Sequence, residues 1–145
     1  MQKKPLPVGI DDFEKLIRNN YYYVDKTLFI KDLLDKKGEV NLFTRPRRFG
    51  KTLNQSMIRF FFENTGSLEG NEANQALFKD LQIMKQGDRY TQEMSSYPVI
   101  SLSLKSSKQP DWELAYGCLK EEIGREYLRH RIVLDSLKVP EQKRR

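Results

Sequence analysis

The segment from Val40 to Glu63 constrains the fold of this chain more than any other part of the sequence. A short apolar run, VNLFT, is followed at once by a basic loop, RPRRFGKT, and then by LNQSMIRFFFE. In the last segment Leu53, Met57 and Phe60 recur at intervals of four and three, which is typical of an amphipathic helix. The sequence therefore predicts a buried strand, a loop and a helix in immediate succession.

The loop matches the second half of a phosphate-binding motif. That motif has a glycine, four free positions and then Gly-Lys-Ser or Gly-Lys-Thr, placed between a buried strand and a helix. Gly50, Lys51 and Thr52 fit this pattern. A glycine adopts backbone angles closed to other residues, and the following helix presents unpaired N–H groups and the positive end of its dipole to an anion. We therefore predict phosphate binding at the start of this helix.

The side chains of the loop have separate expected roles. Lys51 would reach the β- and γ-phosphates, and the Thr52 hydroxyl would complete the coordination of Mg²⁺. Arg47 and Arg48 add planar donors for phosphate oxygens. The predicted ligands are a nucleoside triphosphate, ATP, and Mg²⁺, with Thr52 as the metal ligand. The predicted binding residues are Arg45, Pro46, Arg47, Arg48, Phe49, Gly50, Lys51 and Thr52.

Arg45 is the one departure from the motif, because it occupies the position of the first glycine. Pro46 then holds Arg45 in an extended conformation. On spacing alone, the alternative interpretation is a charged loop that ends where a helix begins.

Two stretches of the chain resemble the opening of the bacterial AAA-ATPase-like family of P-loop NTPases. They read LPVGIDDFEKLIRNNYYYVDKTLFIKDLL and NLFTRPRRFGKTLNQSMIRFFFE, and family members carry a loop of the form TRPRRFGKT. YPVISLSLK and the helix near Trp112 resemble the next stretch of such proteins. Arginine is usual at the Arg45 position in that family, so the resemblance implies nucleotide binding by this loop. It also makes an adenine contact plausible near Asp25, Lys26 and Thr27, where a turn and helix cap is the alternative.

The resemblance and two apolar runs together predict the fold class. Val40–Thr44 and Tyr97–Leu104 (YPVISLSL) have the composition of strands. Helices are expected over Asp11–Arg18, with Asp11 as the cap, over Thr27–Gly38, with Phe29 in an apolar stripe, and after Asp111. We expect an α/β fold, an incomplete three-layer P-loop NTPase sandwich in which helices flank a partial, mostly parallel sheet. The expected domain spans residues 1–135, and residues 136–145 form a basic, disordered tail.

The sequence lacks an apolar strand that ends in an acidic residue, which is a second element of nucleotide-hydrolysing sites. Hydrolysis in such folds needs an apolar strand that ends in Asp or Glu, but PVISLSL ends at Lys105. The resemblance places that strand later, and many members continue into a restriction-endonuclease-like nuclease domain. We therefore assign no catalytic residue and expect ATP binding without hydrolysis, in the N-terminal portion of a larger protein. A small complete nucleotide-binding module is the alternative.

The charge of the chain supports a second hypothesis, a nucleic-acid-binding module. With 26 Lys and Arg against 20 Asp and Glu, the net charge is +6. Basic side chains cluster at Arg45, Arg47 and Arg48 and recur at Arg125, Arg129 and Arg131. The aromatic rings of Tyr21–Tyr23 could stack on bases. A single helix face of arginines is more often solvated, so nucleotide binding remains the leading hypothesis. An inactive remnant is the third.

Several classes of protein and site are disfavoured by the sequence. The N-terminus lacks the apolar run of a signal peptide, and no stretch approaches the roughly 20 apolar residues that span a bilayer, so we expect a cytoplasmic protein with no membrane partner. Cys118 and His130 are the single cysteine and histidine. An internal disulfide and a multi-histidine metal site are therefore excluded.

Overall fold

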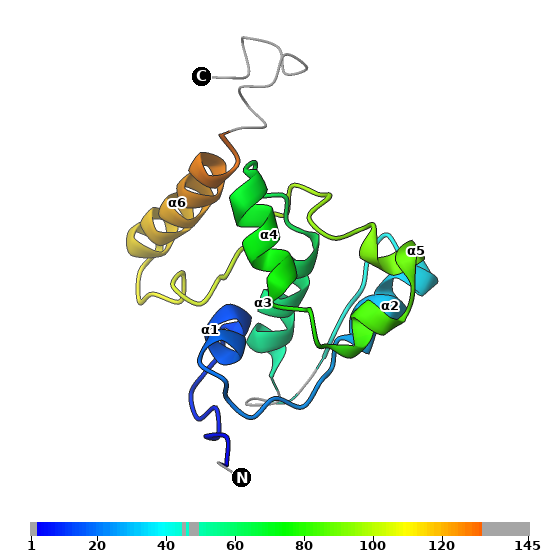
Figure 1. The fold of residues 1–145 in the computed structure, drawn as a ribbon. Helices are drawn as coiled ribbons and strands as arrows, with labels where there is room; N and C mark the ends of the chain where they lie inside the picture. The colour runs from blue at the N-terminus through cyan, green and yellow to red at the C-terminus, as the bar shows by residue number, and fades with distance from the viewer. Residues whose placement is uncertain (1–2, 45, 47–49, 132–145) are drawn as a thin grey trace, which may run out of the picture. The chain divides into compact units, whose positions relative to one another are not determined.

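The computed structural model describes residues 3–44, 46 and 50–131, and its elements are helical (Figure 1). In chain order they are α1 (Phe13–Arg18), α2 (Leu28–Lys36), α3 (Lys51–Phe62), α4 (Leu68–Ala76), the 3-10 turn η1 (Gln82–Lys85), α5 (Asp88–Thr91) and α6 (Trp112–Arg129). The chain divides into two compact units, Met1–Tyr97 and Pro98–Arg145. Residues 136–145, the predicted tail, lie outside the described part. No described helix has the length and apolar character needed to cross a membrane.

The predicted α/β sandwich with a parallel sheet is wrong. The described residues form no sheet, and their strand-type pairing is one isolated parallel bridge between Glu63 and Tyr97. Val40 and Leu42 of the first expected strand are 89% and 86% exposed, and Leu104 of the second is exposed too. A strand is stable only when another segment pairs with its backbone, and composition alone does not supply that partner.

The helix predictions fare better because helices depend on local signals. The helices expected near the N-terminus, after the basic loop and after Asp111 are all present. Asp12, not Asp11, caps α1, since its carboxylate accepts from Lys15 N at 2.8 Å. Helix α2 ends before Gly38, and Lys37 takes the left-handed conformation that closes it (φ 47°).

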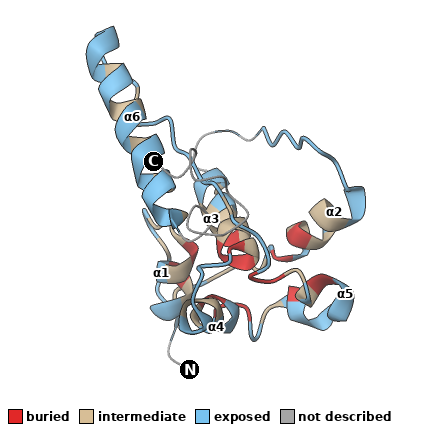
Figure 2. Cartoon of the chain, turned by 90° about the horizontal axis from the view of Figure 1, so that it is seen from above, coloured by how far each residue is buried: buried red, intermediate tan, exposed pale blue. Residues whose placement is uncertain are grey.

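A hydrophobic core in the first unit holds α3 in place. Met57, Phe60 and Phe61 occupy one face of α3 and are buried. The ring of Phe61 lies 5.3 Å from that of Phe78, which in turn lies 5.0 Å from Phe13 of α1. Figure 2 shows buried residues in α3, at the start of α2 and in α5. The helix that follows the basic loop is therefore fixed by aromatic packing.

Polar contacts join α3 to the N-terminal part of the unit. The backbone N–H of Phe13 donates to Ser56 Oγ at 3.0 Å, and this hydroxyl donates to Asp12 at 3.3 Å. The Tyr23 hydroxyl donates to Met57 Sδ at 3.3 Å. These hydrogen bonds fix the rotation of α3 about its axis. They therefore determine which face of α3 points away from the core.

The start of α2 is anchored to η1 by a buried hydroxyl. Thr27 is 0% exposed, and its hydroxyl donates to Asp25 at 2.7 Å and accepts from Ile83 N at 3.1 Å. The second oxygen of the Asp25 carboxylate accepts from Gln82 N at 2.7 Å. The hydrogen bonds of Asp25 and Thr27 therefore hold the start of α2 against η1.

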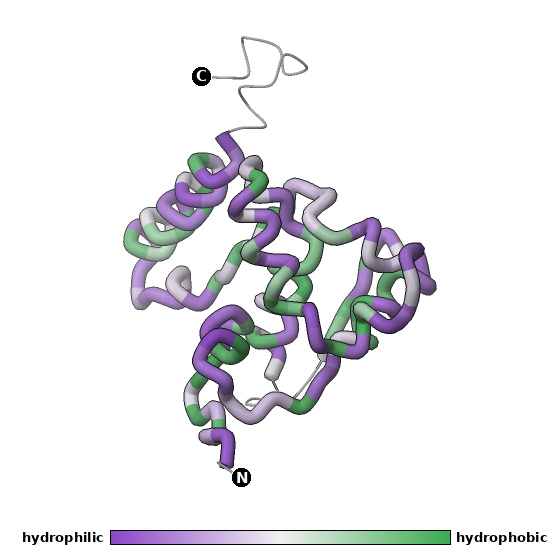
Figure 3. Tube along the Cα trace, viewed as in Figure 1, coloured by the Kyte–Doolittle hydropathy of each residue, from purple (hydrophilic) through white to green (hydrophobic). Residues whose placement is uncertain are grey.

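The second unit contains an extended segment bound to α6. Ser101 N donates to Glu126 Oε2 at 3.0 Å, and the Val99 carbonyl oxygen accepts from Arg129 at 2.8 Å. Helix α6 is 18 residues long and has no buried residue. Figure 3 shows apolar and polar residues mixed along it.

Candidate functional site

The N-terminus of α3 carries the described part of the predicted phosphate loop. Gly50 is the N-cap, and Lys51 and Thr52 are exposed in the first turn. Pro46 is also described and is exposed. Four predicted residues, Arg45, Arg47, Arg48 and Phe49, lie outside the described residues.

Gly50 has a backbone that other residues rarely adopt. Its φ is 71°, and a Cβ added there would meet no heavy atom within 4 Å. Glycine is thus favoured here by conformation and not by crowding. No atom of the described residues crowds this position.

The first turn of α3 lacks the side-chain cap that three other helices possess. Asp12, Ser67 and Asp111 each accept a hydrogen bond from the first turn of α1, α4 and α6. Gly50 has no side chain to do this, and the first turn of α3 contains no acidic residue. Among the described residues, no acceptor receives the N–H groups of residues 51–53. This helix end is suited to an anion.

A cavity of about 340 Å³ lies beside this helix end. From α3 it is lined by Lys51, Asn54, Gln55 and Ile58, and from elsewhere by Lys26, Phe29 and Phe43. The four α3 residues share one face, because they are spaced by three and four. The rings of Phe29 and Phe43 meet edge to face at 4.5 Å and 70°. The fold thus brings Lys26 to the same cavity as Lys51.

Most residues that line this cavity are not among the binding residues predicted from the sequence. Phe29 was expected in an apolar helix stripe and Phe43 in a buried strand, whereas both line the cavity. Asn54 and Gln55 lie outside the apolar stripe of Leu53, Met57 and Phe60 in the predicted helix, and this polar position is the signal that could have found them. Of the Asp25–Thr27 segment, Lys26 reaches the cavity, and the other two side chains form the anchor to η1.

Two basic residues of the nucleic-acid hypothesis have acidic neighbours on their own helix. Arg125 pairs with Glu122 at 2.7 Å, and Arg129 pairs with Glu126 at 2.5 Å. Tyr23 is directed to Met57 of the core, whereas Tyr22 is 54% exposed. These contacts reduce the positive charge of Arg125 and Arg129 and the ring surface of Tyr23 that a polyanion could reach.

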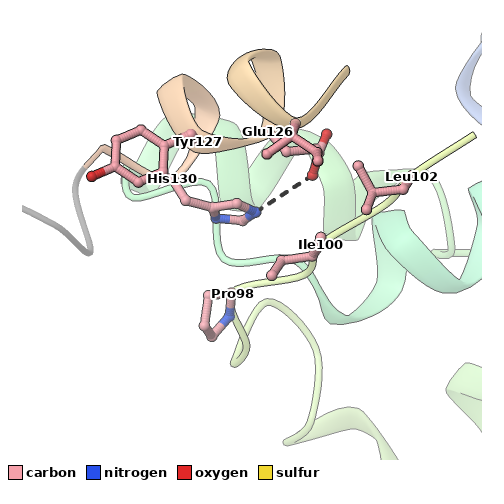
Figure 4. Close-up of a pocket in the computed structure, with 7 residues that line it drawn as sticks. Pro98, Ile100, Leu102, Glu126, Tyr127 and His130 are labelled. Carbon is pink, nitrogen blue, oxygen red and sulfur yellow. Dashed lines mark ion pairs between the residues drawn. The ribbon is translucent and has the colours of Figure 1, made fainter. Parts of the chain in front are cut away.

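A second cavity, of about 530 Å³, lies within the second unit (Figure 4). It is lined by Pro98, Ile100, Leu102, Ile123, Glu126, Tyr127 and His130. His130 Nε2 lies 2.7 Å from the Val99 carbonyl oxygen and 3.8 Å from Glu126 Oε2. The lining of this second cavity is mainly apolar and includes the Glu126 carboxylate, so the cavity does not suit a phosphate.

The start of α3 combines a helix N-terminus without a side-chain cap, a glycine with positive φ and an adjacent lysine, which are features by which proteins can bind anions. The family model described as predicted AAA-ATPase matches residues 7–143. The chain belongs to this AAA-ATPase-like family.

Comparison with known proteins also gives a longer relative. An uncharacterized protein in the vnfD 5' region of Azotobacter chroococcum mcd 1 is 38% identical over 89 residues. The match covers 61% of this chain and 15% of that protein. No solved structure matches the chain.

Proposed function

We propose that this chain binds Mg-ATP, with the phosphates held at the N-terminus of α3 by Gly50, Lys51 and Thr52. The observation that carries this proposal is the uncapped start of α3, preceded by Gly50 at φ 71°. Backbone N–H groups and the helix dipole attract phosphate oxygens there, and Lys51 adds a full positive charge. Membership of the AAA-ATPase-like family supports a nucleotide as the anion.

The described residues fit both the nucleotide and the metal ion. A Cβ at Gly50 would meet no described atom within 4 Å, and the Thr52 hydroxyl has no hydrogen-bond partner within the described part of the chain. Among the residues that the structure describes, no three His, Cys, Asp or Glu side chains gather into a metal site. Mg²⁺ would therefore be held by phosphate oxygens, water and Thr52, and it would offset the charge of the phosphates.

Calorimetric titration of the full chain with ATP and Mg²⁺ tests the proposal. Lys51→Ala should weaken binding about tenfold or more, because a charge-assisted contact contributes roughly 1.5–3 kcal/mol. Lys79→Ala, on the exposed Lys79, is the matched control and should bind like the wild type. Equal affinity in the two variants would contradict the proposed role of Lys51.

A further inference from the structure

The cavity beside α3 changes in chemistry along the helix. Lys51 lines it at the first helical residue, the amides of Asn54 and Gln55 follow, and Ile58 lines it about 10 Å further along the axis. The aromatic pair Phe29–Phe43 completes the lining. One end therefore suits an anion, and the rest suits a flat apolar group with a polar edge.

A nucleobase has these properties. Aromatic side chains stack on bases, and Asn and Gln amides offer both a donor and an acceptor to a base edge. Two lysines and no carboxylate are found among the described residues of the lining, so the ligand as a whole should be anionic. The volume of about 340 Å³ lies within the range of small-molecule sites.

We propose that this cavity is the nucleobase subsite, with the base held against Phe29 and Phe43 and its edge bonded by Asn54 or Gln55. The assignment rests on the proposed function, because Gly50, Lys51 and Thr52 set where the phosphates lie. Phe43 is the principal base contact, since it is 47% exposed and its ring is braced by Phe29.

The neighbouring Asp25–Thr27 segment contributes through Lys26 alone. The Thr27 hydroxyl is buried and bonded to Asp25 and Ile83, so it cannot reach a ligand without breaking the anchor of α2. Both oxygens of the Asp25 carboxylate are already acceptors within the unit. Recognition of the base thus falls to the aromatic pair and the α3 amides.

The test compares two ligands on the full chain, Mg-ATP and inorganic tripolyphosphate with Mg²⁺, by calorimetry. Phe43→Ala should weaken ATP binding about tenfold, which is within the range for one base stacked on an aromatic ring. It should leave tripolyphosphate binding unchanged, and Phe43→Trp should restore the affinity for ATP. Leu42→Ala is the matched control, because Leu42 adjoins Phe43, is 86% exposed and does not line the cavity.

The outcomes separate this subsite from the phosphate site. If wild type binds both ligands and Phe43→Ala changes neither, the nucleobase subsite is wrong and phosphate binding stands. Binding of neither ligand by the wild type overturns both proposals. Circular dichroism checks the fold of Phe43→Ala, and if that variant is unfolded, the double variant Asn54→Ala/Gln55→Ala decides in its place. Both residues line the cavity, so a selective loss of ATP affinity supports the subsite and an unchanged affinity for ATP overturns it.

Discussion

Helices α3 and α6 differ in amphipathic character, which is stronger in α3, and they are stabilised in different ways. Helix α3 has 12 residues and buries Met57, Phe60 and Phe61, whereas α6 has 18 residues and buries none. Local contacts support α6: a cap from Asp111 and ion pairs one turn apart. The helix that carries the candidate site is thus held by packing, and the longer helix by its cap, its ion pairs and its hydrogen bonds to Val99 and Ser101.

The largest expected effect tests whether packing holds α3. Phe61 is 0% exposed and contacts the ring of Phe78, so Phe61→Ala should lower the free energy of unfolding by about 3–5 kcal/mol. Leu128→Ala in α6 is the control, because Leu128 is 69% exposed, and its effect should stay within about 0.5 kcal/mol. Urea denaturation of both variants gives the comparison. Similar losses would remove the distinction between the two helices.

A smaller effect is expected at the buried anchor of the first unit. Thr27→Val keeps the shape of the side chain but leaves Ile83 N–H without its acceptor. The expected loss is about 1–3 kcal/mol, the cost of a buried polar group without a partner. Urea denaturation measures it. A variant as stable as the wild type would show that the hydroxyl is not needed to hold α2 to η1.

The pH dependence of stability provides a third test of the packed unit. Burial, together with the nearby Asp25 carboxylate, raises the pKa of Tyr23 from 10.0 to about 12, against the lowering effect of the hydrogen bond from Lys26 N. Between pH 10 and 12 the unfolded state loses the phenol proton while the folded state keeps it, so stability should fall as the pH rises through this window.

In Tyr23→Phe this contribution disappears, and the free energy of unfolding should fall less steeply over the same window. Stability measured by urea at several pH values makes the comparison with wild type. Parallel pH profiles for the two proteins would contradict the role of Tyr23.

The smallest expected effect concerns the local support of α6. Asp111 accepts from Leu114 N at 2.9 Å, and its replacement in Asp111→Ala should cost about 1 kcal/mol of helix stability. Amide hydrogen exchange in the first turn of α6 should then speed up about fivefold. Exchange in α3 serves as the internal reference. Unchanged exchange at Leu114 would mean that the cap does not support this helix.

The contrast between local and distant contacts explains how far the sequence predicts the fold. The cap at Asp111, the amphipathic face of α3 and the glycine before Lys51 are local features, and all are present in the structure. Asp12 replaced Asp11 as a cap because a one-residue shift lies within the precision of such patterns.

The remaining errors concern contacts between distant segments. Val40–Thr44 has strand composition, but no described segment pairs with it. The approach of Phe43 to Phe29, which forms the cavity lining, depends on how the unit folds around α3. Neither the helical pattern around Phe29 nor the strand pattern around Phe43 predicts this contact, so the sequence does not predict the cavity.

The exposed face of α6 has a thermodynamic consequence that calorimetry can detect. The heat-capacity change of unfolding follows the apolar surface that becomes hydrated, whereas the enthalpy also includes the hydrogen bonds of the helix. Because α6 has no buried residue, melting it should absorb heat with little change in heat capacity. Within the described part of the chain, the curvature of stability with temperature should therefore come mainly from the aromatic core around α3.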